Sequence, residues 1–201
     1  MTPIDRRGRT VILLAFAITV LVAGLVVVAV ARGPSPSSGG AGARAGTSAG
    51  LTIYPEDDRT TFPTLSGPDL EGRALTTADY DGKILVVNIW GSWCGPCRAE
   101  APALSRVAKA SAADGVQFLG IDTRDNTSAA QAFVERFDLP YPSFDDRDGR
   151  VLLHLKGIAP LASVPSTALV SARGEVAAVA IGPLDETTLQ GLIDDLLAER
   201  R

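Results

Sequence analysis

The 201-residue sequence has few residues of the kinds that bind metals or nucleic acids. It contains two cysteines and one histidine, too few to complete a four-ligand zinc site or to build a disulfide framework. Its 19 basic residues are outnumbered by 23 acidic ones, giving a net charge of −4, so no basic surface is available to neutralise phosphates. Its 20 glycines and 13 prolines are too few for a fibrous or wholly disordered chain. These absences exclude nucleic acid as the main partner and leave one globular domain plus an N-terminal segment of different character.

A long uncharged run near the N-terminus, residues 11–31, has only two residues outside the hydrophobic set. As a helix it would extend about 30 Å, the thickness of a bilayer's hydrocarbon core. Three arginines precede it, so the positive-inside rule places residues 1–10 in the cytoplasm and the rest of the chain outside. A cleaved signal peptide ending at residues 29–31 is the alternative, but signal cores are usually only about 7–15 residues long. We therefore predict a single-pass signal anchor in the cell membrane over residues 11–31.

The part of the chain after the anchor divides into a linker and one domain. Residues 32–50 are almost entirely glycine, alanine, serine, threonine and proline, a composition that cannot bury a core and is typical of a flexible linker. Residues 51–201 have about the most common size of a single domain and alternate strand-like with helix-like patterns. The predicted strands are residues 83–90, 116–122, 166–170 and 175–181, and the predicted helices are residues 95–111, one capped by Thr127 and one capped by Asp185. Two parallel strands followed by an antiparallel hairpin and a closing helix make a mixed-sheet α/β domain.

Cys94 and Cys97 lie where the first of these strands meets the first helix. Three positions span about one helical turn, so the two sulfur atoms can bond. Cys94 would start the helix, where unpaired backbone N–H groups and the helix dipole lower the pKa of its thiol and favour the attacking thiolate. Cys97, one turn deeper, would resolve the mixed disulfide that Cys94 forms. The pattern therefore indicates a redox-active dithiol.

Three alternatives to a redox dithiol are weaker. Half of a zinc site would need a second ligand pair, which the sequence lacks. A structural disulfide that closes so short a loop would restrict the unfolded chain by only about 2 kcal/mol. Two chance core cysteines would not explain the intervening Gly95–Pro96 at a strand-to-helix junction.

The segment GSWCGPC, residues 91–97, after a buried strand resembles the thioredoxin superfamily. Further features are similar to its membrane-anchored TlpA/ResA-like branch and extend over about residues 60–200. The resemblance implies a thioredoxin-like fold, a mixed sheet flanked by helices, with an N-terminal hairpin over residues 62–83 and a central α-β insert over residues 123–157. Gly95 departs from ResA, which has glutamate there, and leaves the choice of substrate open.

Individual residues support the same resemblance. Asn88 stands six residues before Cys94, where a cytosolic thioredoxin carries a buried acid, and this branch is similar in having asparagine. Glu100 stands three residues after Cys97, as in the CxxCxxE pattern of ResA-like proteins. Val164–Pro165 resembles the cis-proline loop of the family.

The resemblance also implies roles for particular side chains. A buried Glu100 would have a raised pKa and pass a proton to or from Cys97, whereas the alternative is an exposed helix charge. A cis Pro165 would turn the backbone of Val164 outward as an edge for an extended client peptide, whereas the alternative is an ordinary trans turn. Trp93 is expected to pack beside the dithiol and to contact the client.

Together these features predict an extracytoplasmic thiol–disulfide oxidoreductase tethered to the membrane. Reduction is the expected direction, since ResA-like proteins reduce the CxxCH cysteines of apocytochrome c before haem attachment, and a CcdA-like membrane thiol donor would supply the electrons. An oxidase or isomerase for secreted proteins is the alternative within this class. A Sco-like copper-binding protein is the alternative from another class, but it needs CxxxC and a well-placed histidine, and His154 lies among leucines with no partner in the sequence. No metal or cofactor is expected.

Overall fold

The computed structural model describes residues 50–158 and 163–200. The cytoplasmic tail, the signal anchor and nearly all of the linker predicted for residues 1–50 lie outside the described residues, and they stay predictions. Among the residues described, no helix combines the length and the apolar character that crossing a bilayer requires.

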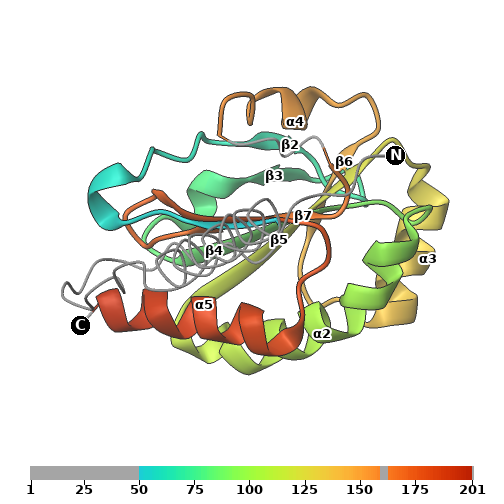
Figure 1. Cartoon of the computed structure of the whole chain (residues 1–201). Coiled ribbons are helices and arrows are strands. Elements are labelled where there is room, and N and C mark those ends of the chain that lie inside the picture. The colour runs from blue at the N-terminus through green and yellow to red at the C-terminus, as the bar shows by residue number, and fades with distance from the viewer. Residues whose placement is uncertain (1–49, 159–162, 201) are drawn as a thin grey trace, which may run out of the picture. The chain divides into compact units, whose positions relative to one another are not determined.

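The centre of the domain is a mixed six-stranded sheet (Figure 1). In spatial order its strands are β1 (Leu51–Ile53), β8 (Val176–Ile181), β7 (Ser166–Val170), β4 (Ile84–Trp90), β5 (Val116–Thr123) and β6 (Ser143–Asp146). Strands β4, β5 and β6 are parallel to one another, whereas β7, β8 and β1 are joined through antiparallel pairs. The four predicted strands are confirmed to within one residue at each end, and so is the mixed-sheet α/β class.

Strand β4 is buried along its whole length and carries the site. It pairs with β5 on one side and with β7 on the other, and all seven of its residues are buried. Such a strand must be apolar almost throughout, and in ILVVNIW only Asn88 is polar. Parallel pairing sets Trp90, the last residue of β4, beside Asp122 near the end of β5. The loops that follow these two strands therefore meet at the same edge of the sheet.

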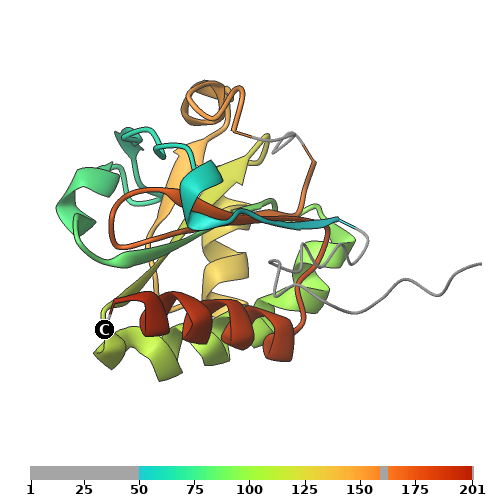
Figure 2. The ribbon, with the colours of Figure 1, turned by 60° about the vertical axis from the view of Figure 1, so that its left-hand side comes forward.

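Three helices cover one face of the sheet, and an N-terminal segment together with the short helix α4 covers the other (Figure 2). The first face carries α2 (Gly95–Ser111) with its 3-10 extension η3 (Ala112–Asp114), α3 (Thr127–Phe137) and α5 (Glu186–Glu199). The second face carries the 3-10 helices η1 (Glu56–Asp58) and η2 (Thr77–Tyr80), the strands β2 (Ser66–Pro68) and β3 (Ala74–Thr76), and the short helix α4 (Arg150–Leu153). The apolar side chains of α2, α3 and α5 form one cluster with β4 and β5, which holds the dithiol helix firmly on the sheet.

Both additions implied by the resemblance are present. Strands β2 and β3 pair antiparallel and form the hairpin expected within residues 62–83. The insert expected over residues 123–157 consists of α3, β6 and α4, and it extends the sheet by the parallel strand β6.

The start of α3 differs from the prediction. Its N-cap is Asn126, whose Oδ1 accepts a hydrogen bond from the Ala129 N–H at 2.9 Å. Thr127 is instead the first helical residue, and its hydroxyl donates to Asp145 on β6 at 3.0 Å. Both residue types cap helices well, so the sequence does not show which of the two is the N-cap. The contact of Thr127 with Asp145 on β6 decides it.

Candidate active site

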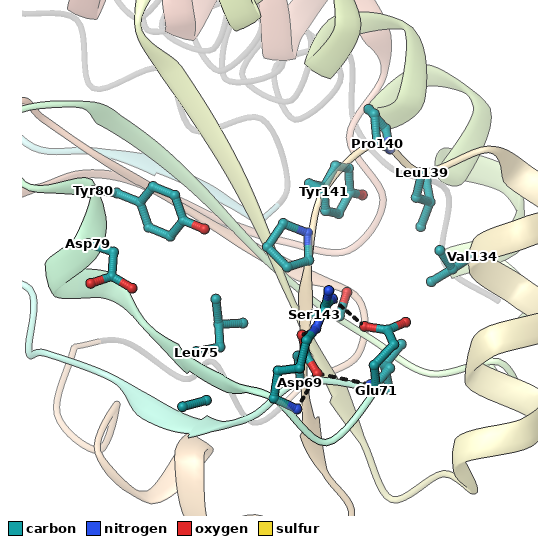
Figure 3. A pocket seen from close by; sticks show the side chains of 14 residues that line it. Asp69, Glu71, Leu75, Asp79, Tyr80, Val134, Leu139, Pro140, Tyr141 and Ser143 are labelled. Atoms are coloured by element: carbon teal, nitrogen blue, oxygen red, sulfur yellow. Dashed lines mark hydrogen bonds and ion pairs between the residues drawn. The ribbon is translucent and has the colours of Figure 1, made fainter.

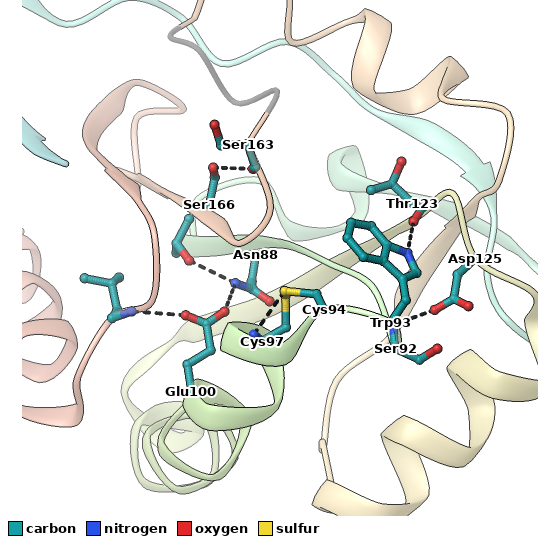
Figure 4. The surroundings of a disulfide bond; sticks show 12 residues. Asn88, Ser92, Trp93, Cys94, Cys97, Glu100, Thr123, Asp125, Ser163 and Ser166 are labelled. Atoms are coloured by element: carbon teal, nitrogen blue, oxygen red, sulfur yellow. Dashed lines mark hydrogen bonds between the residues drawn. A yellow bond between two sulfur atoms is a disulfide. The ribbon is translucent and has the colours of Figure 1, made fainter.

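The two cysteines form a disulfide where β4 passes into α2 (Figure 4). Their Cα atoms lie 5.3 Å apart. Cys94 is the N-cap of α2, and its Sγ accepts a hydrogen bond from the Cys97 N–H at 3.1 Å. Pro96 lies in the first turn, where its missing N–H removes no helical hydrogen bond. The prediction of a Cys94–Cys97 pair at a helix N-terminus is confirmed.

The two cysteines differ in their access to solvent. Cys94 is 4% exposed and Cys97 is 1% exposed, while Gly95 and Pro96 between them are exposed. Both residues are thus buried in the oxidised protein, and Cys94 is slightly the more exposed of the two. This order agrees with an attacking Cys94 and a resolving Cys97, and that division of labour stays a prediction.

Glu100 lies one turn beyond Cys97 on α2 and is only 3% exposed. Its Oε1 accepts a hydrogen bond from the Asn88 side-chain amide at 3.0 Å, and its Oε2 accepts one from the Leu184 N–H at 3.0 Å. Burial disfavours the charged carboxylate and raises the pKa of Glu100 to about 7, although both hydrogen bonds act in the opposite direction. The alternative of an exposed helix charge is wrong. Glu100 is thus a carboxyl group that can take up or release a proton at neutral pH.

A buried polar network connects Glu100 to the segment that follows Pro165. The side-chain amide of Asn88 donates a second hydrogen bond, to Thr167 Oγ1 at 3.0 Å. Thr167 is the second residue of β7, directly after Ser166, and both Asn88 and Thr167 are buried. Sequence reasoning named Asn88 but missed Thr167, because the two residues are far apart in the chain. Through this network the Glu100 side chain of α2 is linked to Asn88 on β4 and to Thr167 on β7.

The Val164–Pro165 peptide bond is cis, as the resemblance implied. Pro165 is buried, and its carbonyl oxygen accepts a hydrogen bond from the Gly182 N–H at 2.9 Å. The Ser166 hydroxyl donates to the Ser163 carbonyl oxygen at 2.6 Å, which closes the loop drawn beside the disulfide in Figure 4. Val164 is partly buried and packs against the apolar cluster that contains both cysteines. The backbone edge that Val164 would offer to a client stays a prediction.

Trp93 lies at the surface beside the dithiol. It is 47% exposed, and its indole N–H donates to the Thr123 carbonyl oxygen at 3.2 Å. The Arg124 guanidinium lies 5.3 Å from the centroid of the indole ring, within cation–π distance. Trp93 is thus held in place while much of its surface stays open. That is compatible with the client contact predicted for it.

Trp90 is buried, and it supports the site from within the core. Its ring stacks on that of Phe133 of α3 with centroids 4.5 Å apart, and its indole N–H donates to Ser143 Oγ at 3.3 Å. Gly120 on β5 leaves room for this arrangement, because a Cβ there would meet Trp90 Nε1 at 2.6 Å and overlap the Ser143 hydroxyl. Trp90 is therefore a packing residue.

Sequence reasoning missed two aspartates beside the loop that precedes Cys94. Asp122, near the end of β5, is fully buried, and within the described residues neither of its side-chain oxygens meets a hydrogen-bond donor. Burial first, and then the negative charge of Asp125, raise the pKa of Asp122 to about 8. Asp125 accepts a hydrogen bond from the backbone N–H of Ser92. One signal could have found Asp122: an aspartate closes the apolar run VQFLGID, at the strand end where α/β proteins place their functional loops.

The described part of the chain contains no group of three or more His, Cys, Asp or Glu side chains that could hold a metal ion. His154 is exposed at the end of α4, and its Nδ1 lies 3.0 Å from the Arg150 carbonyl oxygen. His154 is therefore a surface residue of the insert.

A hollow of about 540 Å³ lies away from the dithiol, between the β2–β3 hairpin and the segment that leads into β6 (Figure 3). Asp69 on its rim accepts hydrogen bonds from the Arg73 and Glu71 backbone N–H groups and pairs with the Arg73 guanidinium at 2.8 Å. These contacts close the turn of the hairpin. Both carboxyl oxygens of Asp69 therefore already have hydrogen-bond partners within the hairpin.

Known proteins resemble the chain over most of the described domain. Residues 59–179 match the AhpC/TSA family. The thiol-disulfide oxidoreductase ResA of Geobacillus thermodenitrificans is 31% identical over 136 residues, which cover 68% of this chain and 76% of that protein. The thiol:disulfide interchange protein HelX of Rhodobacter capsulatus is 33% identical over 161 residues, covering 75% of this chain and 88% of HelX. The crystal structure of a DsbF homologue from Corynebacterium diphtheriae matches with a TM-score of 0.68 at 30% identity, covering 82% of this chain and 98% of that one. These matches confirm the thioredoxin-like fold.

Proposed function

Because this chain belongs to the AhpC/TSA family of the thioredoxin superfamily and is a thiol–disulfide oxidoreductase, we propose that it reduces the disulfides of exported client proteins. Cys94 and Cys97 carry the exchange, and two electrons pass from this dithiol to the client disulfide. The observation that carries the reducing direction is the burial of Glu100 one turn from Cys97.

A buried carboxylate beside a dithiol favours the disulfide form of the protein. A strong dithiol oxidant is one whose reduced form is stabilised, with the attacking cysteine held as a thiolate. Negative charge on Glu100 opposes a second negative charge on the thiols nearby. The reduced protein is thereby destabilised, which makes it a better electron donor. Glu100 therefore favours reduction of the client over its oxidation.

The exchange takes place in two balanced steps. The Cys94 thiolate attacks one client sulfur, forms a mixed disulfide and releases the other client sulfur as a thiolate. The Glu100 carboxylate then takes the proton of Cys97, and the Cys97 thiolate attacks the Cys94 sulfur. This closes the Cys94–Cys97 disulfide and releases the first client sulfur. Glu100 gives its proton to one of the client thiolates and is ready for the next cycle.

Apocytochrome c is the client that the resemblance favours, because the cysteines of its CxxCH motif must be reduced before haem attachment. An extended client segment would pair with the backbone of Val164, while the exposed face of Trp93 contacts apolar client side chains. A membrane thiol donor of the CcdA type would return two electrons to the Cys94–Cys97 disulfide. Both the client and the donor belong to the proposal.

The direction is tested by the equilibrium reduction potential of the dithiol. We expect a value near that of thioredoxin, about −270 mV, rather than near the −120 mV or so of a strong oxidant. The protein is equilibrated with thioredoxin or glutathione of known redox state, and its free thiols are counted by alkylation and mass spectrometry. In parallel, the reduced protein is mixed with an oxidised CxxCH peptide. A potential near the oxidant value, with no reduction of the peptide, would favour an oxidase instead. Retention of one copper equivalent by the reduced protein would favour the copper-binding alternative.

We further propose that residues 11–31 anchor the domain on the outer face of the cell membrane. The support is the uncharged length of this segment and the arginines before it, together with a domain whose first strand begins at Leu51, directly after the linker. Protease added to intact spheroplasts should release a soluble domain whose N-terminus, read by mass spectrometry, lies within residues 32–50. A cytoplasmic marker protein that stays intact controls for lysis. A soluble mature protein beginning at Arg32 would instead identify a cleaved signal peptide.

A further inference from the structure

Asp122 is a buried acid that the exchange steps above do not use. It is 0% exposed, and its two carboxyl oxygens face no hydrogen-bond donor from residues 50–158 or 163–200. Among the side chains that the structure describes, it is the sole buried carboxyl group that meets no hydrogen-bond donor. An ionised carboxylate in such a place would lose the full benefit of hydration with nothing to replace it. The position therefore requires either a bound proton or a ligand.

The surroundings of Asp122 point to a bound proton. The charged groups with the largest effect on it are acidic: Asp125 in the loop after β5 and the pair Asp145 and Asp146 on β6. The one cation of the same loop, Arg124, lies over the Trp93 ring instead. Strand β4 and the loop after it, residues 84–93, contain no charged residue, and Glu100 of α2 is already hydrogen bonded to Asn88 and Leu184. No cation in this set could pair with an Asp122 carboxylate.

The neighbouring acids, in contrast to Asp122, each have hydrogen-bond or ion-pair partners, although burial still raises the pKa of Asp146. Asp145 pairs with Arg147 at 2.9 Å, and the two oxygens of Asp146 accept hydrogen bonds from the backbone N–H groups at the start of α4. Asp125 accepts hydrogen bonds from the N–H groups of Ser92 and Asn126. An ionised Asp125 offers Asp122 no donor, but its carboxyl group lies close enough to share a hydrogen bond once one of the two is protonated. A single proton held between the two carboxyl groups would therefore give Asp122 its hydrogen bond.

We propose that Asp122 is a positioning residue of the dithiol: protonated, it donates a hydrogen bond to Asp125 and thereby fixes the carboxylate that holds the segment before Cys94. Asp125 holds this segment through the Ser92 N–H, and the Thr123 carbonyl oxygen holds it through the Trp93 indole (Figure 4). The loop after β5 thus fixes residues 92–93 by two hydrogen bonds. The geometry of Cys94, the next residue, depends on these two bonds.

Loss of the Asp122 proton to solvent would weaken the hydrogen bond between Asp125 and the Ser92 N–H. The two adjacent carboxylates would then repel each other, and Asp125 would be pushed from the Ser92 N–H. Side chains alternate along β5, so Asp122 faces the same side of the sheet as Phe118, the side on which α2 lies. A second negative charge there also disfavours a thiolate at the N-terminus of α2. The protonation of Asp122 does not depend on the client or on the direction of exchange, whereas the rate test below rests on the reducing function proposed above.

The protonation is tested by tryptophan fluorescence of the full-length oxidised protein, in which no thiol titrates. Because burial and acidic neighbours raise the pKa of Asp122 to about 8, we expect a fluorescence step near that pH. The step should disappear in Asp122→Asn, whose amide donates to Asp125 at every pH. Two variants serve as controls: Glu100→Gln should keep the step, and Asp145→Asn, which removes a neighbouring charge, should move it to lower pH. A wild-type protein without the step, or an Asp122→Asn protein that keeps it, would overturn the proposal.

The positioning role is tested by the rate at which the reduced protein reduces insulin. At pH 7, Asp122→Leu, which cannot donate, should be about tenfold slower, and Asp122→Asn should be within about twofold of wild type. Above pH 8 the asparagine variant should also lack the additional fall in rate that ionisation of Asp122 causes. Thermal unfolding identifies a leucine variant that is not folded, and the asparagine variant then still tests the pH profile. A leucine variant as fast as wild type, or an asparagine variant as slow as the leucine variant, would overturn the role.

Discussion

Cys94→Ser is expected to lose all disulfide exchange, whereas Cys97→Ser should stop halfway, as a covalent complex with its client. Cys94 is the more accessible of the two cysteines, and it lies at the N-cap of α2, where its sulfur accepts the Cys97 N–H. In the reduced protein the same N–H and the helix dipole stabilise the Cys94 thiolate. Without Cys97, nothing in the protein displaces the client from Cys94, so the mixed disulfide persists.

The trapped complexes are measured on non-reducing gels after rapid acid quenching, and the linked cysteines are identified by mass spectrometry. The double variant Cys94→Ser/Cys97→Ser gives the background of client that binds without a covalent bond. Equal trapping by the two single variants would contradict the assignment of Cys94 as the attacking thiol. It would also show that the small difference in exposure between the two cysteines does not decide which one reacts.

Glu100→Gln should slow turnover by at least about tenfold at pH 7 and lower the pKa of one of the two thiols. Glutamine keeps the shape of the side chain but carries neither a transferable proton nor a charge. The three groups titrate as a coupled set, so the measured pKa values belong to Cys94, Cys97 and Glu100 together. Thiolate absorbance and the rate of iodoacetamide alkylation, followed from acid to alkaline pH, report the shift.

The buried network can accept glutamine without a lost hydrogen bond. The glutamine oxygen would take the Leu184 N–H that Oε2 of Glu100 now accepts. If the Asn88 amide turns over, its oxygen accepts hydrogen bonds both from the glutamine amide and from the Thr167 hydroxyl. The same flip of the Asn88 amide would let its oxygen accept a hydrogen bond from protonated Glu100. Asn88 can therefore hydrogen bond to Glu100 in both protonation states. The variant is therefore expected to fold and to form its disulfide.

The stability of the oxidised protein should show the same group titrating. The folded-state pKa of Glu100 is raised from 4.5 to about 7, so between these pH values the folded protein keeps a proton that the unfolded chain releases. The free energy of unfolding contributed by this group therefore falls as pH rises, by about 3 kcal/mol in all. In Glu100→Gln that part of the fall should be absent, as measured by urea unfolding at pH 5 and pH 8.

Glu135→Gln is the matched control, since it makes the same chemical change on an exposed position of α3. It should change neither the thiol titration nor the difference in stability between the two pH values. If Glu100→Gln behaves like this control in both measurements, Glu100 takes no part in proton transfer. The candidate site would then be reduced to the two cysteines and the Pro165 loop.

The sequence by itself determined the elements whose signals are local. The apolar run of β4 requires burial on both faces, and CGPC after it places two sulfurs within one helical turn. Asp185 was correctly predicted to cap α5, because its side chain reaches an N–H only three residues away, at Thr188. The resemblance added Glu100 and the cis peptide before Pro165, since family motifs encode contacts that local pattern does not.

The tertiary structure alone decided which polar groups meet across strands. Asn126 rather than Thr127 caps α3 because the Thr127 hydroxyl is engaged by Asp145, a residue of the next strand. The sequence likewise offers Asp122 as one more aspartate at a strand end. Its lack of any donor and the position of Asp125 follow only from the parallel register of β4, β5 and β6. The physical reason is the same in both cases: the partner of a buried polar group is set by which backbone segments pack side by side, and no local pattern records that.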